Sequence, residues 1–517
     1  MKFLTYFGND LLHAKLPEGS DIYYPPLPMS GIPRSAIAAS VRRALENPLG
    51  MESLRDLVNS HSRILIAFDD NCQPFPLMKR PDFRQTAIET LLEMLYSYGV
   101  QKENILLMCA VALHRKMKPH ELEYMLGKRI MSEFFPAQLK NFDAEDPDDI
   151  VSLGRTEQGE EVETTRAVIE SDLVIYVDTV QIPLNGGHKS VAVGFGTYNS
   201  LSRHHAPQMT EKDPHVMQPD GSHMHASIER ISRVILKRCR VLLLEAAMNS
   251  ATYPAHMRFL SKARNDCNGL ESALRAMSPA AMKLFPEPIR RRIFRSIRSD
   301  YSPIEINAGP IDAVHPRTLE VLRKQLEVRV PRQYDTLVFG LADLSPYSVG
   351  ARVNPILVVS DVLGYVFNWF YNRPFVKKGG VVIILNPVLE VFHEQYHAAY
   401  RKFWDEVLPV TSDPFQMQEL FQDRFAKDPE LVDRYRNHYA HHGFHPFTVW
   451  YWATFPLRYL SKVILVGPRD PDIARRLGVE WAPSLRKALD MAREASGGDD
   501  VLALTIPPFM YLRVDGE

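Results

Sequence analysis

The stretch that decides the fold is Leu173-Val-Ile-Tyr-Val177, followed after a short gap by Asn185-Gly-Gly-His-Lys189. The first part reads as a buried strand, and the second reads as a tight turn at the C-terminal side of that strand. The glycine pair Gly186-Gly187 lets the backbone approach a bulky ligand without clashes from Cβ atoms. The amine of Lys189 and the imidazole of His205 could then meet on one ligand, the amine as tether or charge and the imidazole as metal ligand. The alternative interpretation is a glycine turn with a surface lysine and solvated histidines.

The overall composition is that of a globular protein with several domains. At 517 residues the chain is too long for one ordinary core, so two or more domains are expected. Hydrophobic residues make up 45% of the chain and charged residues 24%, with a net charge of −1. Such a balance gives no electrostatic footprint for nucleic acid or for an anionic membrane, so neither is expected as a partner.

The cysteines and the N-terminal segment indicate the compartment. The four cysteines show no CxxC spacing, which argues against a disulfide framework and against a zinc ribbon. Polar residues follow Met1–Tyr6 within ten positions, so we expect no signal peptide. The longest apolar run, Ile356 to Phe370, is interrupted by Asp361, Gly364 and Asn368, and is too short to span a bilayer. We therefore predict a cytoplasmic soluble protein.

Strand-like runs alternate with helix-like runs through the first half of the chain. The strand-like runs are 63–68, 104–110, 173–177 and 191–193, and helix patterns are expected over 86–98 and 119–126. This alternation is typical of a parallel, doubly wound sheet, in which ligands bind beyond the carboxyl ends of the strands. Asp69-Asp70, His114 and the turn from Gly186 to Lys189 all fall at such ends.

A second unit begins after the proline- and arginine-rich stretch 279–310. Its expected strands are 337–339, 355–359, 380–385 and 462–466, and an amphipathic helix is expected over 485–495. We therefore predict two α/β domains with mainly parallel sheets, residues 1–275 and 276–517, and an active-site cleft between them.

Two polar side chains at the strand ends carry the first functional hypothesis. Asp70 could bind a hydroxyl group or orient an imidazole, although aspartates before a helix are as often caps. His114 is placed for general base work, since its ordinary pKa is near 6.5. The competing interpretation of His114 is a hydrogen-bonded loop histidine.

Taken together, these segments resemble a known family. The run Asp70-Asn-Cys-Gln-Pro74, the run Ala112-Leu-His-Arg115 and the later segment from Leu153 through Gly186-Gly187-His-Lys189 to His205 are similar, in order and spacing, to the nickel-pincer lactate racemase family. The second half is similar more weakly, at Gly379-Gly380 and at Lys462 to Gly467.

The resemblance implies a cofactor and a reaction. In that family a nickel-pincer nucleotide (a pyridinium-3-thioamide-5-thiocarboxylic acid mononucleotide) is tethered to the lysine that corresponds to Lys189, beside Gly186 and Gly187. The histidine that corresponds to His205 coordinates Ni, which suits the preferences of nickel. The counterpart of His114 removes the hydroxyl proton of a 2-hydroxy acid while hydride moves to the cofactor. The implied partners are a small hydroxylated substrate and the proteins that make the cofactor; a homo-oligomer stays open.

Several positions depart from the family pattern. The arginine that would grip a substrate carboxylate is Gln73, which carries no charge. The second catalytic histidine of the family corresponds to Thr179, a poor general base, so His188 or Asp178 could supply the second proton relay. A racemase or epimerase is therefore predicted, acting on a 2-hydroxy acid or a related hydroxylated substrate. An epimerase-like or redox enzyme that handles one face only, on a larger and uncharged or polyhydroxylated substrate, stays open. The alternatives are a non-racemising redox enzyme and an inactive, ligand-binding homologue.

Two histidine motifs offer competing metal sites. His393-Glu-Gln-Tyr-His397 matches the HExxH pattern of zinc hydrolases, a short pattern that often arises by chance. The cluster His438, His441, His442 and His445 could hold metal, line a substrate cleft, or form a hydrogen-bonded loop.

Overall fold

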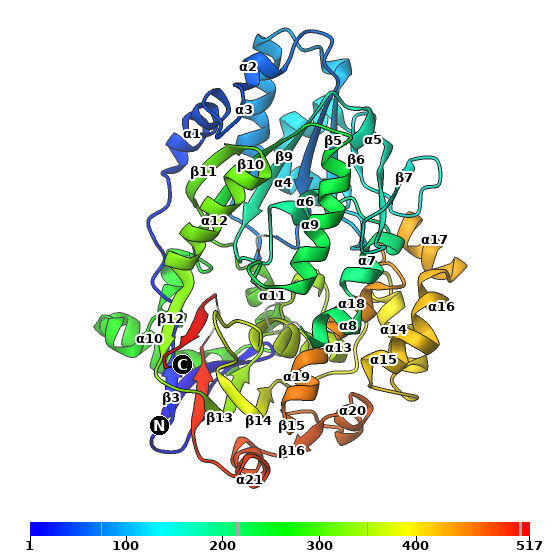
Figure 1. The fold of residues 1–517 in the computed structure, drawn as a ribbon. Helices are drawn as coiled ribbons and strands as arrows, with labels where there is room; N and C mark the ends of the chain where they lie inside the picture. Colours follow the sequence, from blue (N-terminus) through cyan, green and yellow to red (C-terminus); the bar gives the residue numbers. More distant parts are fainter. Residues whose placement is uncertain (74, 213–217, 349, 506–508, 517) are drawn as a thin grey trace.

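The computed structural model describes the chain except residues 74, 213–217, 349, 506–508 and 517. Two six-stranded sheets, each associated with helices, lie in the upper and lower parts of the molecule (Figure 1). Buried apolar side chains from both parts belong to one continuous cluster, so the two α/β units share a core. The predicted fold class is confirmed.

The first sheet has the strand order β11 (Pro303–Gly309), β10 (Val241–Met248), β9 (Leu173–Val180), β4 (Ile64–Asp69), β5 (Ile105–Ala110) and β6 (Leu139–Asn141). All neighbours are parallel except β10 and β11, which are antiparallel. Strands β4, β5 and β9 are almost wholly apolar and buried, as expected of a sheet covered on both faces. The associated helices are α1 (Arg34–Glu46), α3 (Phe83–Ser97), α4 (Pro119–Phe134), α9 (His223–Leu236) and α12 (Ile311–Leu326).

The second sheet is entirely parallel, with the order β16 (Glu480–Ala482), β15 (Lys462–Val466), β14 (Val376–Leu385), β13 (Tyr334–Gly340), β17 (Val501–Leu504) and β3 (Asp21–Tyr23). Helix α21 (Leu485–Ser496) packs against its central strands. The helical elements beside the site are α13 (Pro355–Ser360), the π-helix η5 (Asp361–Val366), α14 (Ala398–Glu406), α17 (Pro429–Asn437) and α18 (His445–Tyr451).

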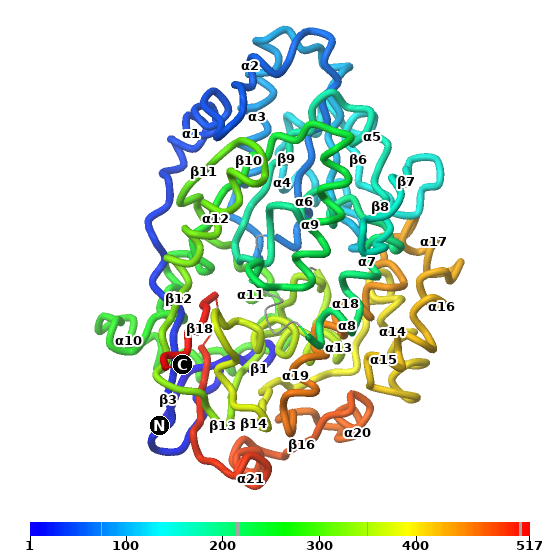
Figure 2. Tube along the Cα trace, viewed as in Figure 1, coloured from blue at the N-terminus to red at the C-terminus, as the bar shows by residue number. Residues whose placement is uncertain are grey.

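The predicted boundary at residue 275 is not the boundary of the two units. Strand β3 pairs with β17, so the start of the chain lies beside its end in the second sheet (Figure 2). Conversely, β11 and α12 follow residue 276 but pack on the first sheet. The chain therefore crosses between the units more than once.

Two expected strands are helices. Residues 191–193 were expected to be a strand, but 191 and 192 end helix α6 (His188–Ala192), which starts directly after Gly187. Residues 355–359 lie in α13, where the side chain of Asn354 accepts a hydrogen bond from the backbone N–H of Leu357 and Pro355 takes the first helical position. Both signals favour a helix start and outweigh the β-branched composition.

The apolar run from Ile356 to Phe370 is thus divided between α13 and η5. Within the described ranges of the chain, we find no helix that is both long and apolar enough to cross a membrane.

Candidate functional site

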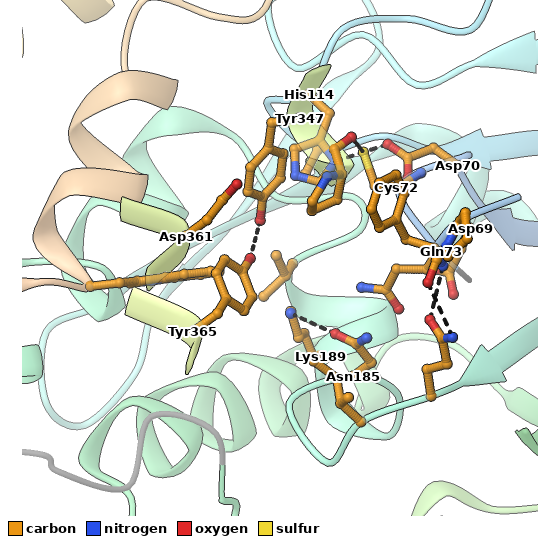
Figure 3. Close-up of a pocket in the computed structure, with 18 of the residues that line it drawn as sticks. Asp69, Asp70, Cys72, Gln73, His114, Asn185, Lys189, Tyr347, Asp361 and Tyr365 are labelled. Carbon is orange, nitrogen blue, oxygen red and sulfur yellow. Dashed lines mark hydrogen bonds and ion pairs between the residues drawn. The ribbon is translucent and has the colours of Figure 1, made fainter. Parts of the chain in front are cut away.

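A cavity of about 270 Å³ lies where the carboxyl ends of the first sheet meet the second unit. Figure 3 shows polar side chains from both units around it. The first unit contributes Asp69, Asp70, Gln73, His114, Lys189 and His205, and the second contributes Tyr347, Asp361, Tyr365, His445 and Trp452. The cleft that the sequence predicts between two α/β units is therefore where most of the predicted site residues gather.

Asp70 and His114 form a hydrogen-bonded pair at the ends of β4 and β5. The His114 Nδ1 atom lies 2.8 Å from Asp70 Oδ2, and the backbone N–H of Cys72 donates to Asp70 Oδ1 at 2.9 Å. Burial opposes ionisation of Asp70, but His114 and these hydrogen bonds outweigh it and hold the pKa of the carboxyl below its usual value. An ionised Asp70 accepts the Nδ1–H of His114, which leaves Nε2 as a proton acceptor. This arrangement suits a general base.

Lys189 places its amine inside the same cavity. The side chain comes from α6, and Nζ donates to Asn185 Oδ1 at 3.3 Å (Figure 3). Burial lowers the pKa of Lys189 to about 8, against the opposing charges of Asp69, Asp178 and Asp70. A large share of the amine is therefore neutral near pH 8, and the neutral amine is the nucleophilic form.

Gly186 and Gly187 do adopt the conformation that requires glycine, with φ values of 85° and 61°. The space beside them is occupied by protein. A Cβ on Gly186 would lie 2.4 Å from Glu245 Oε2, and one on Gly187 would lie 2.5 Å from the His315 ring. The backbone N–H of Gly187 donates to Glu245 Oε2 at 3.0 Å. Gly186 lines the cavity, but Gly187 is held against the Glu245–His315 pair and does not, contrary to the expectation of close ligand approach.

His205 is a buried neutral imidazole at the end of α7 (Tyr198–His204). Its Nδ1 lies 3.3 Å from the Leu201 carbonyl oxygen, and its ring stacks on Trp452 with centroids 5.8 Å apart. Burial lowers the pKa of His205 to about 3. A neutral imidazole whose Nδ1–H donates to a carbonyl leaves Nε2 for a metal ion, the usual arrangement of a histidine ligand.

His188 lies outside the cavity, although it neighbours Lys189. Its ring nitrogens contact Ser232 Oγ at 2.9 Å and Asp312 Oδ1 at 3.1 Å. Successive residues of a helix point about 100° apart, so Lys189 faces inward and His188 faces α9 and α12. The prediction of a catalytic role for His188 is therefore wrong in geometry. His188, Glu229 and Asp312 could approach a metal ion, but Arg233 bridges both carboxylates.

The other proposed relay, Asp178, is sealed behind the cavity wall. Burial and the neighbouring charge of Asp69 raise the pKa of Asp178 well above its usual value, so it keeps its proton. Ser190 Oγ donates to Asp178 Oδ2 at 2.5 Å, and Tyr176 donates to Asp69 Oδ1 at 2.8 Å. Thr179 is fully buried and does not line the cavity. Neither Asp178 nor Thr179 contacts the space where a substrate would lie.

Gln73 stands where the sequence comparison places an arginine, and it lines the cavity. Pro74, the next residue of the motif, lies outside the described residues. The guanidinium of Arg84 supports this loop from behind, because Nη1 donates to the carbonyl oxygens of Asp69, Asp70 and Gln73 at 2.9, 2.6 and 2.8 Å.

The HExxH motif does not form a zinc site. It lies in a turn before α14, and His397 is buried with Nε2 3.2 Å from the Tyr347 carbonyl oxygen. The His397 Nδ1 accepts the backbone N–H of His393, at 3.4 Å. A zinc hydrolase needs both histidines free on one helix face, so this hypothesis is wrong in geometry.

The second histidine cluster is a hydrogen-bonded loop. His441 donates from Nε2 to the Tyr347 carbonyl oxygen at 3.1 Å, and His442 Nε2 lies 2.9 Å from Glu145 Oε1. His445 lines the cavity, with Nδ1 2.7 Å from the Tyr400 hydroxyl oxygen. His438 is exposed beside Asp433.

Tyr347, Asp361 and Tyr365 are polar cavity residues that the sequence motifs did not single out. Asp361 and Tyr365 both come from η5, and the hydroxyl groups of Tyr365 and Tyr347 are hydrogen-bonded (Figure 3). π-Helical turns often occur at functional sites. A carboxylate inside the otherwise apolar run from Ile356 to Phe370 was the signal available in the sequence.

Comparison with known proteins gives matches at two levels. Residues 7–217 match the family model of the lactate racemase N-terminal domain. The lactate racemase of Thermoanaerobacterium thermosaccharolyticum is 22% identical over 179 residues, 34% of this chain and 39% of that protein. The lactate racemase of Lactiplantibacillus plantarum is 23% identical over 195 residues, 37% of this chain and 43% of that protein. The matched part spans about two fifths of the length of these curated relatives.

Solved structures extend the likeness of the fold to the whole chain. The lactate racemase apoprotein from T. thermosaccharolyticum has a TM-score of 0.62 at 16% identity and covers 100% of both chains. A protein from Thermotoga maritima has a TM-score of 0.52 at 14% identity and covers 95% of this chain and 100% of its own. At such identities the likeness concerns the fold. The sequence and structure matches together confirm the resemblance drawn from the motifs.

Proposed function

The chain is a divergent lactate racemase-like protein, and from this premise we propose that it is a racemase or epimerase of a hydroxylated substrate. The single observation that carries the proposal is that Lys189, His205 and the Asp70–His114 pair face one cavity.

The side chains present fit a tethered nickel-pincer nucleotide. Lys189 offers a buried amine with a pKa of about 8, which suits covalent attachment, and His205 offers a neutral imidazole for nickel. When bound, this group supplies a site that accepts and returns hydride. The ring of Trp452 stacks on His205 and fixes the plane of the imidazole.

The residues of the chain handle the proton. His114 takes the hydroxyl proton of the substrate on Nε2 as hydride leaves the carbon, and Asp70 keeps the imidazole in the required tautomer. Inversion would require the oxo compound to present its opposite face to the bound group, and His114 would then return the proton to the substrate oxygen.

A second candidate is transfer on one face only. Thr179 occupies the position of the second family histidine and is buried away from the cavity. The absence of a second base at this position favours transfer on one face. Such an enzyme would oxidise one hydroxyl compound and reduce a second oxo compound.

Intact-mass spectrometry of the chain, co-produced with the cofactor-making proteins, tests the proposal. We expect a covalent adduct that is lost in Lys189→Ala and kept in Lys283→Ala, which changes an exposed lysine. Nickel, measured on the same samples, should fall in His205→Ala while the adduct stays. An unmodified parent protein, or an adduct that survives Lys189→Ala, would remove the proposal. Chiral chromatography of the product then separates racemisation from one-face transfer.

A further inference from the structure

The charges around the cavity are unsuited to a carboxylate substrate. The described lining residues include three carboxyl groups, Asp69, Asp70 and Asp361. They include one ammonium group, Lys189, and no arginine. The proposed tether would convert that ammonium into an uncharged amide-like group. A buried carboxylate without a cationic partner is costly, so a substrate carboxylate would be disfavoured here.

The arginines close to the site are committed to other groups. Arg84 is fully buried, forms an ion pair with Asp82 and donates to three loop carbonyl oxygens. Arg115 forms a bidentate pair with Glu121, with nitrogen–oxygen distances of 2.8 and 2.6 Å. Neither guanidinium lines the cavity, so neither takes the place of the family arginine, whose position is occupied here by Gln73.

Asp361 is the unexplained polar group of the cavity wall. Its side chain lines the cavity and is only 7% exposed, and its Oδ1 has no hydrogen-bond partner among the residues that the structure describes. Burial raises the pKa of Asp361 to about 7, although a hydrogen bond from Ser345 opposes this. The Oδ1 atom is itself closed off from the cavity, so Asp361 acts on a ligand through its charge and not through a hydrogen bond at this atom.

The surroundings of Asp361 are aromatic. The ring of Trp369 stacks on Phe509 with centroids 5.8 Å apart, and both line the cavity. The indole N–H of Trp369 is also buried and has no acceptor in the described part of the chain. The wall therefore offers the carboxyl group of Asp361 and a large apolar surface.

We infer that the second unit selects an uncharged substrate, a 2-hydroxy amide or a similarly neutral hydroxyl compound with an aromatic or branched apolar body. The carboxyl group of Asp361 disfavours a negative charge at the polar end of this substrate. The apolar body packs against the aromatic wall. This inference rests on the proposed function for the reacting hydroxyl group, which lies at His114.

A matched pair of ligands tests it. Mandelamide and mandelate share the hydroxyl group and the phenyl ring and differ in charge at the other end. Binding to the full chain at pH 8.5 can be followed by tryptophan fluorescence, because Trp369 and Trp452 line the cavity. We expect the dissociation constant of mandelamide to be at least tenfold below that of mandelate.

The variant Asp361→Asn should reduce this preference at least fivefold, because it removes the charge that repels mandelate. The matched control is Asp343→Asn, another buried carboxyl with a raised pKa that does not line the cavity, and it should keep the parental preference. Equal or tighter binding of mandelate, saturable binding of neither ligand, or an unchanged preference in Asp361→Asn would overturn the inference.

The mass of the Lys189 adduct, measured on the same preparations, separates the two ideas. An adduct together with a preference for mandelate would support the proposed function and contradict the inference of a neutral substrate. A preference for mandelamide without an adduct would support the neutral substrate and contradict the proposed function.

Discussion

The two walls of the cavity differ in what their side chains are prepared to do. The first wall lies within the region that matches the lactate racemase N-terminal domain and carries the hydrogen-bonded Asp70–His114 pair, the Lys189 amine and the His205 imidazole. The second wall lies outside that region and carries Tyr347, Asp361, Tyr365 and a set of aromatic rings. Under the proposals above, the first wall would hold the chemistry and the second the selection of the substrate, so that each could change without the other.

The variant His114→Gln gives the strongest test of whether the two walls act separately. It keeps a hydrogen bond to Asp70 but removes the base, so turnover should fall about 10²- to 10⁴-fold. The preference for neutral over charged ligands should stay within twofold, and the Lys189 adduct should remain. The measurement is turnover beside ligand binding on loaded protein. A lost adduct, or a changed preference, would mean that the walls do not act separately.

The second-largest effect concerns the stability of the second wall and its pH dependence. The pKa of Asp361 rises from 3.8 to about 7 on folding, so the folded state loses stability as the pH rises through about 7. At roughly 1.4 kcal/mol per pH unit, the loss is at most about 4 kcal/mol. Asp361→Asn should therefore be more stable than the parent above pH 8, with the difference vanishing towards pH 4.

Urea unfolding at a series of pH values measures this difference. A variant that is less stable than the parent at pH 9 would show that the carboxylate of Asp361 is well solvated or paired. Asp343→Asn serves again as the control for the loss of a buried carboxyl group.

A pair of glycine substitutions sharpens the account of the first wall. Gly187→Ala would place a Cβ 2.5 Å from the His315 ring at φ 61°, whereas Gly154→Ala, at φ 90°, meets nothing within 4 Å. Both substitutions place an alanine at positive φ, and Gly187, with ψ −133°, also lies outside the left-handed helical region that other residues tolerate. Gly187→Ala should lose about a further 1–3 kcal/mol through the clash. If thermal unfolding showed the same loss of stability in both variants, the Glu245–His315 pair would be able to move away from the new Cβ without cost.

The smallest expected effect is that of Tyr365→Phe, which leaves the Tyr347 hydroxyl without its partner and should cost about 1 kcal/mol of stability. Tyr23→Phe breaks a hydroxyl pair with Tyr334 outside the cavity lining, where Tyr334 keeps its hydrogen bond to Asp21. Tyr23→Phe should therefore cost less stability than Tyr365→Phe, and only Tyr365→Phe should change ligand affinity. Calorimetry and fluorescence titration distinguish these effects.

The sequence predicted the first wall better than the second for physical reasons. Strands β4, β5 and β9 are long apolar runs with polar residues directly after them, and parallel pairing brings those polar residues together. Short runs such as 355–359 carry no such signal, because a buried strand and a buried helix share the same apolar composition. In the run 355–359, only the N-cap Asn354 and the proline that follows it indicate a helix.

The inward or outward direction of a side chain was also beyond reach from sequence alone. His188 and Lys189 are neighbours, yet one contacts Asp312 and the other lines the cavity. The position of Asp361 depends on a π-helical turn, which the apolar composition of the surrounding run does not specify.

The pairing of β3 with β17 has a consequence for synthesis. Asp21 pairs with Leu502, so an early segment of the chain must wait, unpaired, until nearly all the rest has been made. Contacts so distant in sequence slow folding. The first sheet also needs β11, which comes after β10 and a long intervening segment. A ribosome that stalls near residue 480 would therefore carry a chain in which β1 (Lys2–Phe7) and β2 (Asp10–Lys15) can pair with each other, while β3 has no strand to pair with.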